Sequence, residues 1–80
     1  MISAYVLITM QLGKTDKAIK EMIKIENLAK ISVIAGDYDI VVRTQVKNLK
    51  ELLGVTDKLQ MIDGVTKTTT QIIEKEISLQ

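Results

Sequence analysis

Two carboxylates flank an aromatic residue near the middle of the chain and are the first candidates for chemistry. Asp37 and Asp39 stand on either side of Tyr38, directly after Gly36. Paired carboxylates can act as general acid and base, or they can hold an ammonium group by charge-assisted hydrogen bonds. Glycine followed by aspartate is also an ordinary turn sequence, so the segment has a purely structural interpretation as well.

A second group of polar side chains lies towards the C-terminus. Thr66, Thr68, Thr69 and Thr70 offer hydroxyl groups that can donate hydrogen bonds to a carboxylate. Threonine is β-branched and is also common on half-exposed edge strands, which need no ligand to explain them. Taken separately, each of the two segments can therefore be explained by local structure alone.

The composition argues against several other kinds of site. The chain has no cysteine and no histidine, so it lacks the usual nucleophile with an imidazole base and the usual zinc or copper ligands. Its four glycines are far apart and form no phosphate-binding loop. Asp37 and Asp39 fall at an exposed hairpin tip, where pKa tuning for acid–base catalysis is hard to arrange. We expect a protein that is not an enzyme and that needs neither a cofactor nor a metal.

Charge and hydropathy limit the partners. The net charge is +1 and the lysines and Arg43 are scattered, unlike the basic face of a nucleic-acid-binding protein. RNA-recognition sheets carry stacking aromatic residues, and only Tyr5 and Tyr38 are aromatic here. No apolar run is long enough to cross a membrane, and the N-terminus does not resemble a signal peptide. We expect a cytoplasmic protein that contacts neither membrane nor nucleic acid.

The elements that must position these residues follow from the hydrophobic period. We expect a strand over residues 4–10, then a helix with Thr15 as its N-cap and Ala18, Ile19, Met22 and Ile23 on its apolar side. Strands over 28–35 and 38–46 are close enough to form a hairpin. A final strand is expected over 65–77.

The second helix is expected to begin at Asn48, with Glu51 in a variant of the capping box. Gly54 falls inside this helix, where close packing against a neighbour would explain it. The expected buried stripe consists of Leu49, Leu52, Leu53, Thr56 and Leu59.

The order strand–helix–strand–strand–helix–strand predicts an α+β fold, the ferredoxin-like βαββαβ sandwich. It has a four-stranded antiparallel sheet with two helices on one face, in a single domain spanning residues 1–80. Residues 6–8, 33–35 and 40–42 are runs of apolar residues rather than alternating ones. In so short a chain, this pattern predicts that a second subunit covers the open sheet face. A monomer with an apolar surface is the alternative.

The two polar segments together resemble a known family. Residues 36–39, followed by residues 40–43, resemble the G-x-Y-D hairpin of the leucine-responsive/asparagine-regulator (Lrp/AsnC) family. That hairpin belongs to the effector domain, called the RAM domain for regulation of amino acid metabolism. Residues 64–70 resemble the family's G-V-x-x-T-x-T stretch, and residues 71–73 continue the likeness. The resemblance extends over residues 3–77 of the chain.

This resemblance implies homodimers made by packing sheet faces, rings of dimers up to octamers, and effector sites between neighbouring dimers. An α-amino acid suits such a site, because a carboxylate of Asp37 or Asp39 can hold its ammonium group. Its carboxylate can take donors from the backbone near Gly36 and from threonine hydroxyls. Carried onto this sequence, the residues lining the site are Gly36, Asp37, Tyr38, Asp39, Thr68 and Thr70.

Typical family members carry a DNA-reading helix-turn-helix domain before this one, and no such segment precedes the first strand here. The chain therefore resembles stand-alone RAM proteins, with full-length regulators as candidate partners. Its expected role is to modulate transcription regulation of amino acid metabolism without binding DNA. Two other functions stay open: a purely structural oligomerisation or adaptor domain, and a small enzyme of the dimeric α+β barrel type.

Overall fold

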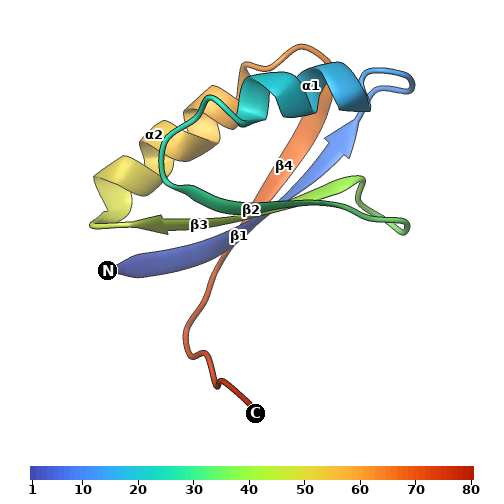
Figure 1. The fold of residues 1–80 in the computed structure, drawn as a ribbon. Helices are drawn as coiled ribbons and strands as arrows, with labels where there is room; N and C mark the ends of the chain where they lie inside the picture. Colours follow the sequence, from blue (N-terminus) through green and yellow to red (C-terminus); the bar gives the residue numbers. More distant parts are fainter.

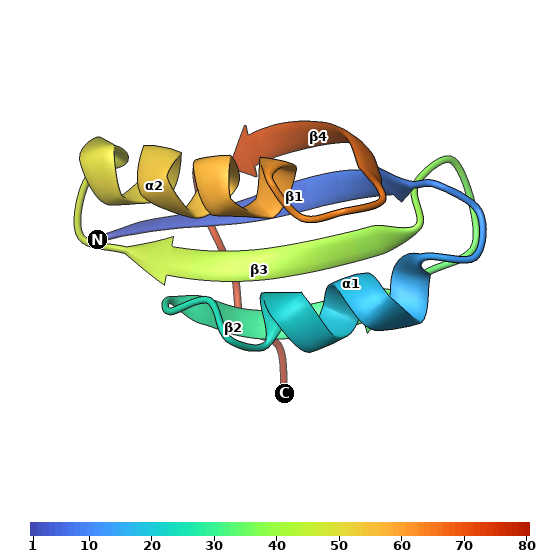
Figure 2. The ribbon, with the colours of Figure 1, turned by 90° about the horizontal axis from the view of Figure 1, so that it is seen from above.

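The computed structural model describes residues 1–80 as two helices and four strands (Figure 1). In chain order these are β1 (Ile2–Met10), α1 (Thr15–Met22), β2 (Leu28–Val33), β3 (Ile40–Val46), α2 (Leu49–Gln60) and β4 (Val65–Ile72). The strands form one sheet in the order β2-β3-β1-β4, and all neighbours are antiparallel. Figures 1 and 2 show both helices on the same side of this sheet. The predicted ferredoxin-like βαββαβ fold is confirmed.

The core lies between the sheet and the helices and follows the alternation of the two central strands. Ala4, Val6 and Ile8 of β1 are fully buried, as are Ile40 and Val42 of β3. Alternate residues of a strand point to opposite faces, so these five share the helix-covered face. The helices contribute Ala18, Met22, Leu52, Val55 and Leu59 to the same cluster.

Helix α2 begins as the sequence predicts. The Asn48 side chain accepts a hydrogen bond from the Glu51 N–H at 2.9 Å, and the Glu51 carboxylate accepts one from the Lys47 N–H at 2.8 Å. Its buried stripe differs from the prediction, because Leu49 and Leu53 are 56% and 63% exposed. Each residue turns a helix by about 100°, so Leu53 is rotated well away from the buried Leu52.

Gly54 does not have the close neighbour expected of it, since no atom lies within 4 Å of the position that a Cβ would take. Helix α1 also differs, because its N-cap is Lys14 rather than Thr15 and no side chain caps it. The left-handed turn at Gly13, with φ of +84°, leads the chain into the helix one residue earlier. The helix ends at Met22, and Ile23 beyond it is 69% exposed.

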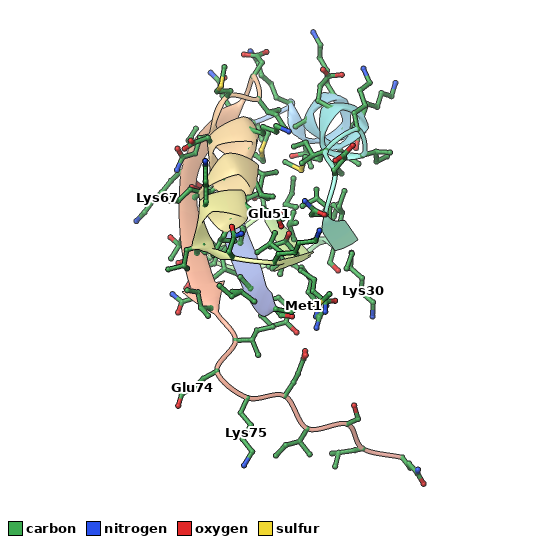
Figure 3. All side chains as sticks on the ribbon, turned by 90° about the vertical axis from the view of Figure 1, so that its left-hand side faces the viewer. Met1, Lys30, Glu51, Lys67, Glu74 and Lys75 are labelled. Carbon is green, nitrogen blue, oxygen red and sulfur yellow. The ribbon has the colours of Figure 1, made fainter.

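The last strand ends at Ile72 rather than Ile77, because the chain turns away from β1 after the pair Ala4–Ile72. The last bond along this ladder joins the Ile73 N–H to the Ser3 carbonyl at 2.8 Å. Residues 73–80 then leave the sheet on the side away from the helices (Figures 1 and 3). The strands of the β2–β3 hairpin are also shorter than expected, so residues 34–39 form a loop. Neither helix is long and apolar enough to cross a membrane.

The open sheet face is less apolar than the sequence pattern predicts. Leu7 is paired with Val41 on one side and Thr69 on the other, which gives this face a small apolar centre. The next row carries Tyr5, Arg43 and Gln71. The apolar run of residues 33–35 does not cover both faces of a strand, because only Val33 lies in β2 and Ile34 already belongs to the loop. Val33 is paired with Ile40, and both face the helix side of the sheet.

Candidate functional site

The loop over residues 34–39 is tied to the sheet through Asp39. The Asp39 N–H donates to the Ile8 carbonyl, and the Asp39 carbonyl accepts from the Ile34 N–H, both at 2.9 Å. The Asp39 carboxylate accepts a hydrogen bond from the Met10 N–H at 2.7 Å. Asp39 therefore anchors the loop to the end of β1.

The other residues of the loop are held less tightly. Asp37 is exposed, and its carboxylate takes part in no hydrogen bond or ion pair within the chain. Gly36 is exposed and Tyr38 is half-buried. The loop is thus anchored at Asp39 and presents one free carboxylate, that of Asp37. This arrangement can receive a cationic group without breaking an existing contact.

The two predicted threonines lie on the helix side of β4. Thr68 is paired with Ile8 and Thr70 with Val6, both of which point into the core. The Thr68 hydroxyl accepts a hydrogen bond from the Gln60 amide at 2.9 Å, whereas the Thr70 side chain has no such bond. Thr66 is occupied locally, because its hydroxyl lies 2.7 Å from that of Thr9.

The fold brings the loop and Thr68 to the same end of the sheet but not into contact. Ile8 is paired with Ile40 on one side and with Thr68 on the other, so β1 lies between them. Two strand spacings amount to roughly 9–10 Å. Thr70 lies two residues further along β4, away from the loop. One subunit therefore brings Gly36, Asp37, Tyr38 and Asp39 together and leaves the threonines apart from them.

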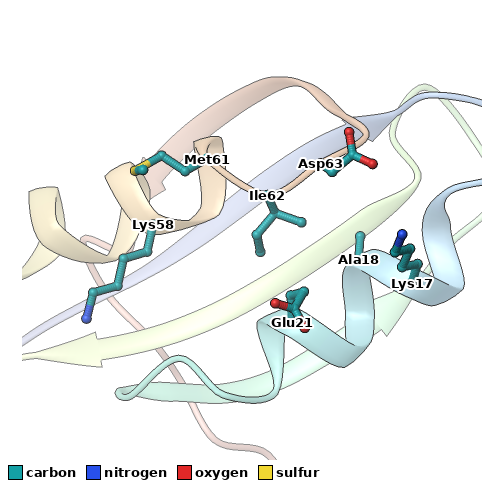
Figure 4. A pocket seen from close by; sticks show the side chains of 7 residues that line it. All are labelled: Lys17, Ala18, Glu21, Lys58, Met61, Ile62 and Asp63. Carbon is teal, nitrogen blue, oxygen red and sulfur yellow. The ribbon is translucent and has the colours of Figure 1, made fainter.

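None of the six predicted residues lines a cavity of the single chain. The largest cavity, about 300 Å³, lies between α1 and the end of α2 (Figure 4). It is lined by Lys17, Ala18, Glu21, Lys58, Met61, Ile62 and Asp63. The predicted residues therefore lie on the open surface of the single chain.

A third polar cluster, on the open sheet face, was not expected from the sequence. The Arg43 guanidinium donates to the Glu76 carboxylate at 2.7 Å and 3.4 Å. This hydrogen bond holds the pKa of Glu76 below its usual value and raises that of Arg43. The alternation of residues 40–46 could have placed Arg43 on the open face, but no local pattern pointed to Glu76 as its partner.

The structure is thus an α+β sandwich whose β2–β3 loop is anchored through Asp39 and carries an unbonded carboxylate at Asp37. The chain matches the Lrp/AsnC ligand binding domain over residues 3–79 and belongs to that family. This confirms the resemblance seen in the sequence.

Relatives contain the domain as part of longer chains. The transcriptional regulator FL11 of Pyrococcus furiosus is 34% identical over 74 residues, which cover 92% of this chain and 49% of that protein. The chain thus spans about half the length of such regulators. The homocitrate synthase of Sulfolobus acidocaldarius is 30% identical over 63 residues, which cover 79% of this chain and 14% of the enzyme.

Solved structures share the fold. The protein TTHA0845 from Thermus thermophilus has a TM-score of 0.89 at 25% identity, covering 99% of this chain and all of that one. A feast or famine regulatory protein of Mycobacterium tuberculosis, solved with L-methionine, has a TM-score of 0.83 at 23% identity. That likeness covers 99% of this chain and 54% of that one.

Proposed function

We propose that this chain is an amino-acid-binding effector module that modulates transcription regulation of amino acid metabolism. It neither catalyses a reaction nor contacts DNA itself. Membership of the ligand-binding family is the observation that carries the proposal. The complex of a fold relative with L-methionine supports the class of ligand. The homocitrate synthase match covers a small share of the enzyme, which suits a regulatory module better than a catalytic domain.

The site is the loop of residues 36–39, and Asp37 is the group that receives the ammonium of the amino acid. Asp37 rather than Asp39 takes this role because the Asp39 carboxylate is already bonded to the Met10 N–H. The backbone near Gly36 and the hydroxyls of Thr68 and Thr70 hold the carboxylate, and Tyr38 walls the pocket. Within one subunit β1 separates the loop from Thr68. The threonines therefore come from a neighbouring subunit.

Assembly is part of this function. Homodimers form through the open sheet face, and dimers join into a ring, an octamer in the simplest case. A ligand bound between dimers stabilises the ring that contains it, so effector concentration sets the oligomer size. Full-length Lrp/AsnC regulators are the candidate partners, and the cytoplasm is the compartment in which such regulators work.

The test is a thermal melting screen against the twenty amino acids, with the molar mass measured by light scattering for each hit. A ligand at a hundredfold excess over Kd adds about 2.7 kcal/mol of stability, which raises the melting temperature of a small domain by on the order of 10 °C. Asp37→Asn should abolish that rise. Asp57→Asn, at an exposed aspartate of α2, is the matched control and should retain it. If no amino acid changes the melting temperature or the mass, the proposal is wrong.

A structural oligomerisation module is the second candidate. It is favoured by the finding that no cavity of the single chain contains the predicted site residues. In that case Asp37→Asn would form the same oligomers as the wild type, and no amino acid would change their size.

A further inference from the structure

The C-terminal segment of residues 73–80, here called the C-terminal arm, crosses the open sheet face. It starts where the Ile73 N–H donates to the Ser3 carbonyl of β1 at 2.8 Å. Three residues later, the Glu76 carboxylate lies 2.7 Å from the Arg43 guanidinium of β3. Since β1 lies between β4 and β3 in the sheet, the arm passes beneath β1. Figure 3 shows it on the side of the sheet away from the helices.

Charge makes the arm and the open face complementary. The register places Lys30, Arg43 and Lys67 on this face, and it places no acidic residue there. Lys30 is directly paired with Arg43, an arrangement of like charges that is unfavourable unless an anion neutralises it. The arm carries two acids, Glu74 and Glu76, against one Lys75. Of these three basic side chains, only Arg43 contacts a carboxylate within one chain, and Lys30 and Lys67 are left without one.

Beyond Glu76 the arm is apolar but has nothing to pack against. Ile77 is 71% exposed and Leu79 is 90% exposed, and neither touches the hydrophobic core. A hollow of about 290 Å³ lies between Glu76 and the sheet, lined also by Tyr5, Lys30, Ser32, Val41 and Arg43. Figures 1 and 3 show the arm continuing away from its own domain. Its last residues thus enter the space that a molecule stacked on the open face would occupy.

We propose that the C-terminal arm clasps a second copy of this chain that is packed on the open sheet face. The Arg43–Glu76 ion pair fixes the direction of the arm, Ile77 and Leu79 pack on the second copy, and Glu74 approaches its unpaired lysines. In a twofold-symmetric dimer the arm of each copy makes the same contact with the other copy. A second copy is the occupant because each copy supplies both the basic face and the acidic, apolar-ended arm. The proposal rests on the pairing of open faces within the proposed function.

The test is the dimer dissociation constant, measured by sedimentation on the full chain without ligand. The double variant Ile77→Ser/Leu79→Ser should weaken dimerisation by at least about tenfold, because two apolar side chains lose their burial. Leu12→Ser is the matched control, since Leu12 is 99% exposed in the turn after β1, and it should change the constant less than about twofold. Glu76→Gln should weaken the dimer as well, because it frees the arm.

Melting of dilute, monomeric protein shows whether the arm packs on its own chain or on the second copy. Ile77 and Leu79 are exposed in the single chain, so the double variant should melt as the wild type does. A lower monomer melting temperature with an unchanged dimer constant would assign the arm to its own chain and overturn the proposal. A wild type that stays monomeric would overturn both the clasp and the pairing of faces. If the arm variants weaken the dimer while no amino acid binds, the clasp stands and the effector role fails.

Discussion

The carboxylate of Asp39 accepts a hydrogen bond from the backbone N–H of Met10 at 2.7 Å, joining the loop before β3 to the end of β1. Asp37, two residues earlier in the same loop, is exposed and unbonded. The two carboxylates are alike in the sequence, yet one supports the fold and the other is free to meet a ligand. Substitutions at the two positions should therefore have opposite effects on stability and on binding.

Asp39→Ala should lower the free energy of unfolding by about 1–3 kcal/mol, because it leaves a partly buried N–H of Met10 without its charged acceptor. Asp37→Ala should stay within about 0.5 kcal/mol of the wild type. Urea unfolding at one fixed protein concentration measures both values. Equal losses in the two variants would contradict the structural role assigned to Asp39.

Gly64→Ala should be strongly destabilising. Gly64 has a φ of +95°, and an added Cβ would lie 2.6 Å from the Lys14 Cβ. The left-handed backbone alone costs a residue with a side chain about 1–2 kcal/mol. Gly54→Ala is the matched control, because nothing lies within 4 Å of its added Cβ. It should stabilise the exposed helix position by about 0.5–1 kcal/mol. Thermal melting of the two variants should move in opposite directions.

Asn48→Ala should cost about 0.5–2 kcal/mol, because the Asn48 side chain caps α2 through the Glu51 N–H. Thr15→Ala provides the comparison at the other helix, where no side chain caps the N-terminus. It should be neutral or slightly stabilising, since alanine is the better helix former. A loss at Thr15 as large as that at Asn48 would show that Thr15 caps α1 in solution.

Acid should release the C-terminal arm. The pKa of Glu76 is lower in the folded chain than its ordinary value of 4.5, so its ion pair with Arg43 is fully present above that value. The contact is then lost as the pH falls through the depressed pKa. Backbone order parameters of Ile77 should accordingly fall when the pH is lowered from neutral into this acidic range. Glu76→Gln should show the low values already at neutral pH, and a pH-independent arm in the wild type would contradict the assignment.

The fold was predictable from the sequence because its signals are local. The short apolar, β-branched runs, the cap at Asn48 and the turn glycines each act within a few residues, and together they fix the order of elements. The predictions are wrong where burial or strand length depends on packing against elements distant in the sequence. The spacing of Leu49 and Leu53 predicts that they are buried, but in α2 both side chains are exposed to solvent. The last strand ends at Ile72, where the chain leaves β1, although its β pattern continues to Ile77.

The candidate site was predictable only in its parts. Glycine and aspartate located the loop, yet the sequence could not show that Asp39 bonds to Met10 while Asp37 stays free. It also could not show that β1 stands between the loop and Thr68. The pairing of Arg43 with Glu76 depends on the path of the chain after the last strand, which no hydrophobic period describes.

The position of β1 in the sheet also bears on how the domain is made. Within this domain β1 precedes the other strands in the sequence, but it pairs only with β3 and β4, and β4 follows them all. The ribosome therefore releases the central strand long before its partners exist, and closing these distant pairs costs loop entropy that is recovered only late. The nascent strand has no partner until β3 has been made, and its second partner comes only with β4. Folding should begin only once β4 has emerged, as one cooperative event for the whole domain.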